Sequence, residues 1–247
     1  MRRGTGKGHS DQETCIWVPW AAMDDPLSPF QVVRDELEIG PLRLSIARPR
    51  SAEDLIDEDE YADDERLPYW AELWPSAHVL AEELLVRDLA GRRVIELGCG
   101  VGLPSIAASL LGATVLATDW YEEALDFTRA NAVASGARVE TLLVDWNAPP
   151  AALFTHGGAD LVIGADVLYE ERNGPALAAL LPRIVGPYGE VLIADPRRPH
   201  AGALLEPMVA AGWTHASEDV PHRVRQDEAG PIIRLHALRP PGHRPPA

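Results

Sequence analysis

Glycines at alternate positions mark the segment best suited to bind a small molecule. Residues 96–104 read Glu-Leu-Gly-Cys-Gly-Val-Gly-Leu-Pro and continue from a short apolar run. Glycine allows a sharp turn and places no Cβ between a ligand and the main chain, so Gly98 and Gly100 are candidate contacts. The strict dehydrogenase pattern G-x-G-x-x-G is not met, because Leu103 occupies the place of its third glycine. The alternative to ligand binding is a purely structural turn.

Polar residues after the next two apolar runs could bind the same ligand. Asp119 lies 21 positions after Gly98, where a carboxylate can accept hydrogen bonds from ribose hydroxyls. Its alternative role is to cap the helix that starts near Tyr121. Asp145 could accept a hydrogen bond from a purine amino group. The indole of Trp146 could lie against the purine ring or belong to the core.

Two further segments could meet a second substrate. Residues 165–169 read Ala-Asp-Val-Leu-Tyr, and residues 195–200 read Asp-Pro-Arg-Arg-Pro-His. Ligands of open α/β sheets bind beyond the carboxyl ends of the strands, near the point where the strand order reverses. Ala165, Asp166 and Tyr169 should therefore face whatever reacts with the first ligand.

The elements that must position these residues alternate between strand and helix patterns. Runs of Val, Ile and Leu without polar alternation are typical of a parallel sheet that helices cover on both faces. Residues 213–238 could add two more strands. The predicted strands are 92–97, 113–118, 139–144, 160–165 and 190–194, and the predicted helices are 103–111, 121–134, 174–185 and 201–211.

The N-terminal part has a different pattern. Alternating apolar residues over 31–48, with Gly40-Pro41 between them, predict a β-hairpin. Ser76 is predicted to cap the helix that follows. Residues 51–66 contain nine Asp/Glu and one Arg, which indicates either a solvated linker or an attractor for a cationic substrate. The predicted organisation is a flexible segment 1–30, a hairpin, linker and capping helix over 31–90, a binding domain 91–238 and a disordered tail 239–247.

Composition limits the classes of protein to which the chain can belong. Its 247 residues predict one elaborated domain. A net charge of −16 argues against binding naked nucleic acid and suits a basic partner. Two cysteines predict a reducing, cytoplasmic compartment. Zinc-ligand spacings, a P-loop lysine and a nucleophile elbow are absent, so no metal site is predicted. No membrane span is predicted, because glycines and Pro104 interrupt the uncharged run 97–118.

The glycine loop, residues 96–102, resembles that of the class I, seven-β-strand S-adenosylmethionine-dependent methyltransferases. Three further features are similar to the protein-lysine methyltransferase branch: Pro-Tyr-Trp-Ala-Glu-Leu-Trp-Pro-Ser over 68–76, the pair Asp145-Trp146, and residues 165–169. That branch includes the electron-transfer-flavoprotein β-subunit lysine methyltransferases and bacterial proteins like nicotinamide N-methyltransferase. The resemblance covers about 31–238. It implies a Rossmann-like, doubly wound, seven-stranded and mainly parallel sheet with an N-terminal hairpin and a capping helix.

The resemblance also implies S-adenosylmethionine as the cofactor and a role for each matching residue. Glu96 would anchor the loop near the methionine amino group, and Trp70 and Trp74 would close the cleft. The implied cofactor-binding residues are Trp70, Trp74, Glu96, Gly98, Gly100, Asp119, Trp120, Asp145, Trp146 and Ala165, and the implied catalytic residues are Asp166 and Tyr169. One departure matters: Val167-Leu168 follows Asp166 where DNA and glutamine methyltransferases carry Pro-Pro, which argues against their acceptors.

The expected function is N-methylation of a protein lysine by a monomeric enzyme. Asp166 and Tyr169 would orient the amine by accepting its N–H groups, while its proton leaves to solvent before transfer. Three alternatives stay open: an enzyme that methylates a small amine, a non-catalytic module that binds S-adenosylmethionine, and an NAD-dependent reductase.

Overall fold

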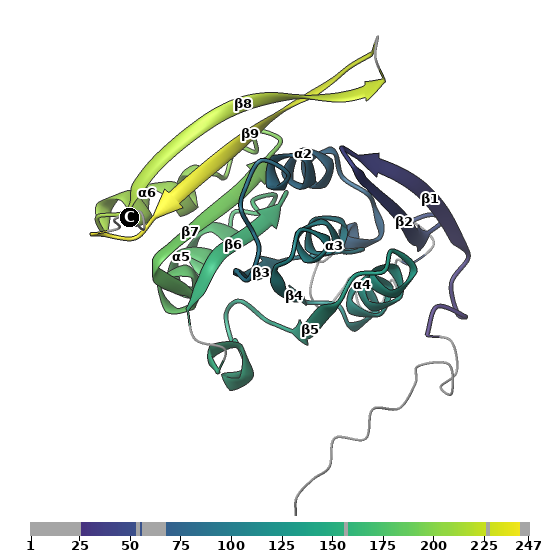
Figure 1. Ribbon diagram of the computed structural model, residues 1–247. Helices are drawn as coiled ribbons and strands as arrows, with labels where there is room; N and C mark the ends of the chain where they lie inside the picture. The colour runs from purple at the N-terminus through teal and green to yellow at the C-terminus, as the bar shows by residue number, and fades with distance from the viewer. Residues whose placement is uncertain (1–25, 53–54, 56–67, 156–157, 226–227, 243–247) are drawn as a thin grey trace, which may run out of the picture.

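The computed structural model describes residues 26–52, 55, 68–155, 158–225 and 228–242 (Figure 1). All nine acidic residues of the run 51–66 lie outside these ranges, as do most of the predicted N-terminal segment and of the predicted tail. The linker and attractor interpretations of the run therefore remain predictions, and so does the division of the chain into four parts.

One seven-stranded sheet organises the molecule, as predicted (Figure 1). Its order is β5-β4-β3-β6-β7-β9-β8, parallel from β5 to β7 and antiparallel at β9 and β8. The chain runs outward from β3 to β5 and then returns to start β6 on the other side of β3, so the order reverses between β3 and β6. The strands are β3 (Arg93–Leu97), β4 (Thr114–Asp119), β5 (Val139–Leu143), β6 (Ala159–Ala165), β7 (Val185–Asp195), β8 (Thr214–Arg225) and β9 (Glu228–Arg239).

Helices cover both faces because successive side chains of a strand point to opposite faces. On β6, Leu161 and Ile163 pack in a cluster with Leu80 and Leu84 of α2, while Val162 packs with Leu177 of α5. All six side chains are buried, which explains why the central strands read as continuous apolar runs. The helices are α2 (Pro75–Leu84), α3 (Leu103–Leu110), α4 (Glu122–Ala134), α5 (Asn173–Ile184) and α6 (Gly202–Ala210), with short 3-10 turns η3 (Tyr69–Ala71) and η4 (Ala151–Phe154).

The predicted N-terminal hairpin is confirmed as β1 (Val32–Ile39) and β2 (Leu42–Pro49). Its buried side chains share a core cluster with Phe127 of α4. Asn131 of α4 joins this hairpin to the glycine loop. Its amide donates to the carbonyls of Ala47 and Val101, and its oxygen accepts the N–H of Ala47 at 2.7 Å.

Two local predictions were wrong. Ser76 does not cap α2: Pro75 stands at the first helical position, Trp74 precedes it, and no side chain caps the helix. The Ser76 hydroxyl is buried without a hydrogen-bond partner among the described residues. Proline suits this position because its missing N–H would have no helical partner there. Strand β7 also begins at Val185 and not at 190. The prediction missed its first residues because Gly186 and Gly189 are typical of a turn.

None of the helices in the described ranges is long and apolar enough to cross a membrane.

Candidate active site

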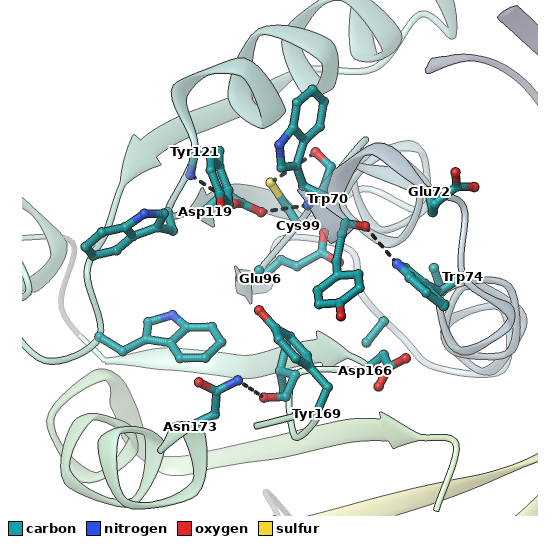
Figure 2. A pocket seen from close by; sticks show the side chains of 18 of the residues that line it. Trp70, Glu72, Trp74, Glu96, Cys99, Asp119, Tyr121, Asp166, Tyr169 and Asn173 are labelled. Atoms are coloured by element: carbon teal, nitrogen blue, oxygen red, sulfur yellow. Dashed lines mark hydrogen bonds between the residues drawn. The ribbon is translucent and has the colours of Figure 1, made fainter. Parts of the chain in front are cut away.

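The carboxyl ends of the central strands border a cavity of about 390 Å³ (Figure 2). It lies where the strand order reverses, between the segments that follow β3 and β6. All twelve residues singled out in the sequence line it: Trp70, Trp74, Glu96, Gly98, Gly100, Asp119, Trp120, Asp145, Trp146, Ala165, Asp166 and Tyr169. The structure thus brings the predicted residues together, although their individual roles remain predictions.

Glu96 places a buried carboxyl group at the end of β3. Its Oε2 accepts hydrogen bonds from the N–H and the hydroxyl of Ser105 on α3, while its Oε1 has no partner among the described residues. Burial raises the pKa of Glu96 to about 8; the charge of Asp119 also raises it, and the Ser105 bonds act in the opposite direction. A buried acceptor without a partner is costly in a folded protein, and it suits a ligand that brings a hydrogen-bond donor or a positive charge.

Asp119, at the end of β4, organises the loops on that side of the cavity. Its Oδ2 accepts the N–H of Gly100 at 2.8 Å, and its Oδ1 accepts the N–H of Tyr121 at 3.1 Å. Burial raises its pKa, although these backbone bonds act in the opposite direction. The carboxylate therefore shapes the loop before α4 and holds the glycine loop, but it does not cap α4, because Tyr121 is the N-cap residue of that helix and no side chain caps it. A carboxylate has about four acceptor positions, so it retains capacity for a ligand hydroxyl.

The two glycines are needed for close packing within the cavity wall. Both have positive φ, 65° at Gly98 and 54° at Gly100. A Cβ at Gly98 would lie 3.2 Å from Val167 and 3.6 Å from Trp146. A Cβ at Gly100 would lie 3.1 Å from the carbonyl oxygen of Trp70. Gly100 thus permits η3 to approach the loop, which is a different reason from the open ligand approach expected from the sequence.

The aromatic side chains on η3 and after it play different structural parts. Trp70 is 8% exposed and packs against Phe127, with 5.6 Å between ring centroids. It is therefore mainly a core residue with one edge on the cavity. Trp74 donates its indole N–H to the carbonyl of Tyr69 at 2.8 Å (Figure 2). Tyr69 in turn packs edge-on against Tyr169, with 5.3 Å between centroids, which links η3 to the loop after β6.

Asp145 and Trp146 follow β5 on the far side of β4. The Asp145 carboxylate accepts the N–H of Asn147 at 2.8 Å, which shapes the loop. Trp146 packs against the core cluster between the sheet and α5 and also lines the cavity. The core alternative for this indole is therefore confirmed, and its contact with a purine ring remains a prediction.

At the end of β6, Asp166 is paired with an arginine that the sequence did not single out as a site residue. Its two carboxylate oxygens accept from Nε and Nη2 of Arg198, both at 2.8 Å. The pKa of Arg198 is raised, chiefly by this hydrogen bond to Asp166. Asp166 does not cap α5, since that helix begins at Asn173 without a side-chain cap.

Sequence reasoning missed three supporting residues. Ser105 binds Glu96, Thr128 donates its hydroxyl to the carbonyl of Gly100 at 2.9 Å, and Arg198 binds Asp166. Arg198 lies in a segment whose place at the rim was predicted, but its partner depends on the distance between two loops. In the described part of the chain, no group of three His, Cys, Asp or Glu residues could hold a metal ion.

The fold, with its cavity at the strand ends, is shared with solved structures of methyltransferases. The solved structure of the 16S rRNA N2 G1207 methyltransferase RsmC from T. thermophilus, in complex with AdoMet and guanosine, matches with a TM-score of 0.59. The match has 14% identity and covers 85% of this chain and 50% of that one, so it bears on the fold alone.

A family model described as lysine methyltransferase matches residues 63–204, more than half of the 247 residues. The chain belongs to this family. It is 42% identical over 123 residues to protein N-lysine methyltransferase METTL21A of Danio rerio, covering 47% of this chain and 56% of that protein. It is 34% identical over 141 residues to the electron transfer flavoprotein beta subunit lysine methyltransferase of Danio rerio, covering 53% and 51%. The chain thus spans about half the length of these relatives.

Proposed function

We propose that this protein transfers a methyl group from S-adenosylmethionine to a lysine side chain of another protein. The observation that carries the proposal is the match to the lysine methyltransferase family over 63–204, a stretch that contains every residue of the cavity wall, from Tyr69 to Arg198. The two Danio rerio relatives described above are named as lysine methyltransferases that act on proteins.

The residues of the cavity fit the cofactor. Within the described residues, Oε1 of the buried Glu96 carboxyl group has no hydrogen-bond partner, and it suits an ammonium group such as that of a methionine moiety, whose positive charge would favour the ionised form of Glu96. Asp119 can accept from ribose hydroxyls, since its backbone bonds leave acceptor positions open. Trp146 and Asp145 border the space where an adenine would lie. When bound, S-adenosylmethionine supplies an electrophilic methyl group on a positively charged sulfur.

The side chains at the other end of the cavity would receive the acceptor. Tyr69, Tyr169 and Trp74 form an aromatic group beside Asp166, and aromatic faces attract cations and exclude water. Methyl transfer requires an amine lone pair in line with the methyl group, so the protein contributes mainly orientation and electrostatics. The amine loses its proton to solvent before transfer, because a protonated amine has no lone pair.

The test is label transfer. The purified protein is incubated with S-adenosylmethionine tritiated on the methyl group and with soluble extract of the source organism. Tritium in methyllysine after acid hydrolysis of the protein fraction supports the proposal. Tritium confined to small molecules identifies a small-amine methyltransferase, and binding of S-adenosylmethionine without any transfer identifies a binding module; either result overturns the proposal. S-adenosylhomocysteine should suppress the label.

A cytoplasmic location, a monomeric state and the lack of nucleic-acid binding remain predictions.

A further inference from the structure

Two loops with unusual backbone geometry meet at one end of the cavity. Asp166 follows β6 and Arg197 lies in the loop after β7, and in the described part of the chain they are the two non-glycine residues with positive φ, at 54° and 69°. L-residues adopt this conformation rarely, and it persists where surrounding contacts hold it. The contact that joins the two loops is the pair of Asp166 and Arg198.

Arg198 is held at both ends. Its guanidinium forms a two-pronged pair with Asp166, with both N···O distances at 2.8 Å. Its backbone N–H donates to the carboxylate of Asp195 at 3.0 Å, and Asp195 is 1% exposed. The Asp166 side chain is 5% exposed and that of Arg198 35%. A planar guanidinium that binds both oxygens of a buried carboxylate holds that carboxylate in one orientation and also compensates its charge. Asp166 and Arg198 both line the cavity.

We propose that Arg198 is a positioning residue for methyl transfer that compensates the charge of Asp166, so that the acceptor enters as a neutral amine. This inference rests on the proposed function. An unpaired carboxylate within about 4–6 Å favours the protonated form of a cationic group and shifts its pKa by about 1–3. A carboxylate already paired with a guanidinium exerts much less of this effect. The acceptor then keeps the lone pair that must attack the methyl carbon, and Asp166 holds the amine by hydrogen bonding and not as its counter-ion.

The remaining titratable groups around this end are mostly acidic. Arg172 is the other arginine in the cavity wall. Behind the pair, His236 on β9 lies 3.7 Å from the Asp195 carboxylate. Loss of the Arg198 charge therefore leaves the acceptor end more negative. The groups that face the pair or share its end of the cavity are Tyr69, Glu72, Glu96, Tyr169, Glu170, Arg172 and Asp195.

The test is the pH profile of label transfer. Initial rates of tritium transfer from S-adenosylmethionine to the protein of a soluble extract are measured from pH 6.5 to 9.5. In the Arg198→Met variant, the pH at which the transfer rate reaches half of its maximum (the midpoint) should increase by about one unit. The rate then falls about tenfold near pH 7.5, and this deficit becomes smaller only as the pH approaches the pKa of the acceptor amine, since the neutral fraction grows about tenfold per pH unit below the pKa. Arg197→Met is the matched control: it removes a cation from the same loop, outside the cavity wall, and should keep the wild-type profile.

Two more variants separate charge from mere structure. Arg198→Lys keeps the charge and loses the fork, so the rate should fall with the midpoint unchanged. In the double variant Asp166→Asn with Arg198→Met, both charges are gone, and the midpoint should return to the wild-type value whatever the rate. A rate loss in Arg198→Met that is equal at every pH overturns the inference and leaves the proposed function standing. Absence of label with wild-type protein overturns the proposed function and this inference with it.

Discussion

The carboxyl group of Glu96 carries a proton at pH values where an exposed glutamate has lost it. Its pKa is about 8 in the folded protein, against a usual value of 4.5, mainly because of burial. Between these values the folded state binds a proton that the unfolded chain releases. The stabilisation linked to this proton is fully present below about pH 4.5 and is lost as the pH rises through about 8, at a rate of about 1.4 kcal/mol per pH unit.

We therefore expect Glu96→Gln to flatten the pH dependence of stability. The amide stays neutral, so it can keep one bond to Ser105 without a charge to desolvate. Between pH 5.5 and 9 the free energy of unfolding in urea should decline more steeply for wild type than for the variant. Parallel curves for the two proteins would mean that Glu96 is ionised in the folded protein throughout this range.

Asp119 acts on a ligand and on two loops at once. Asp119→Ala removes an acceptor for ribose hydroxyls and also the bonds to Gly100 and Tyr121. Affinity for S-adenosylmethionine should fall roughly tenfold to a hundredfold, which corresponds to about 1.5–3 kcal/mol. Titration calorimetry measures this effect, and NAD serves as the negative ligand. Wild-type protein that bound NAD and not S-adenosylmethionine would contradict the cofactor assignment.

At the scale of elements, the contact between η3 and the glycine loop depends on one missing side chain. Gly100→Ala places a Cβ 3.1 Å from the carbonyl oxygen of Trp70 at a φ of 54°. Gly136→Ala is a matched control, because its φ is 73° but nothing lies within 4 Å of the added Cβ. Both variants carry the cost of a left-handed residue, about 1–2 kcal/mol.

We expect Gly100→Ala to lose more stability than Gly136→Ala and to bind S-adenosylmethionine more weakly, because η3 must move away from the loop. Gly136→Ala should keep wild-type affinity. Thermal unfolding and calorimetry on both variants measure the two effects. Equal affinity in the two variants would show that the position of η3 has no influence on the cofactor.

The elements themselves were largely predictable from the sequence, and the reasons are physical. Apolar runs such as 160–165 and helices such as 121–134 have the periodicity of their structures, and the strand ends of a parallel sheet must meet at one edge. That rule alone predicts that Glu96, Asp119 and Asp166 lie close together, and all three line the cavity. The pairing of Asp166 with Arg198 and the place of Gly100 against Trp70 could not be predicted, because both depend on distances between loops and not on spacing along the chain.

At the scale of the whole molecule, the sequence contains an acidic run a few residues before the first residue of the cavity wall. The run 51–66 ends three residues before Tyr69, which lines the cavity. With nine Asp/Glu and one Arg, it accounts for −8 of the net charge of −16. A field of this sign and size raises the rate at which a cationic partner is captured. The effect is much smaller for a ligand without net charge, such as S-adenosylhomocysteine, which lacks the positively charged sulfur.

If the acidic run attracts a basic acceptor, replacing its nine carboxylates by amides should lower kcat/KM for label transfer mainly at low salt. Wild type and variant should converge as the Debye length falls from about 30 Å at 0.01 M salt to about 8 Å at 0.15 M. Affinity for S-adenosylhomocysteine, which has no net charge, should be equal in the two proteins at every salt concentration when measured on the same samples, and it serves as the internal control. Equal kcat/KM at all salt concentrations would leave the solvated linker as the better interpretation of the run, since repulsion among its own charges would then be its only electrostatic consequence.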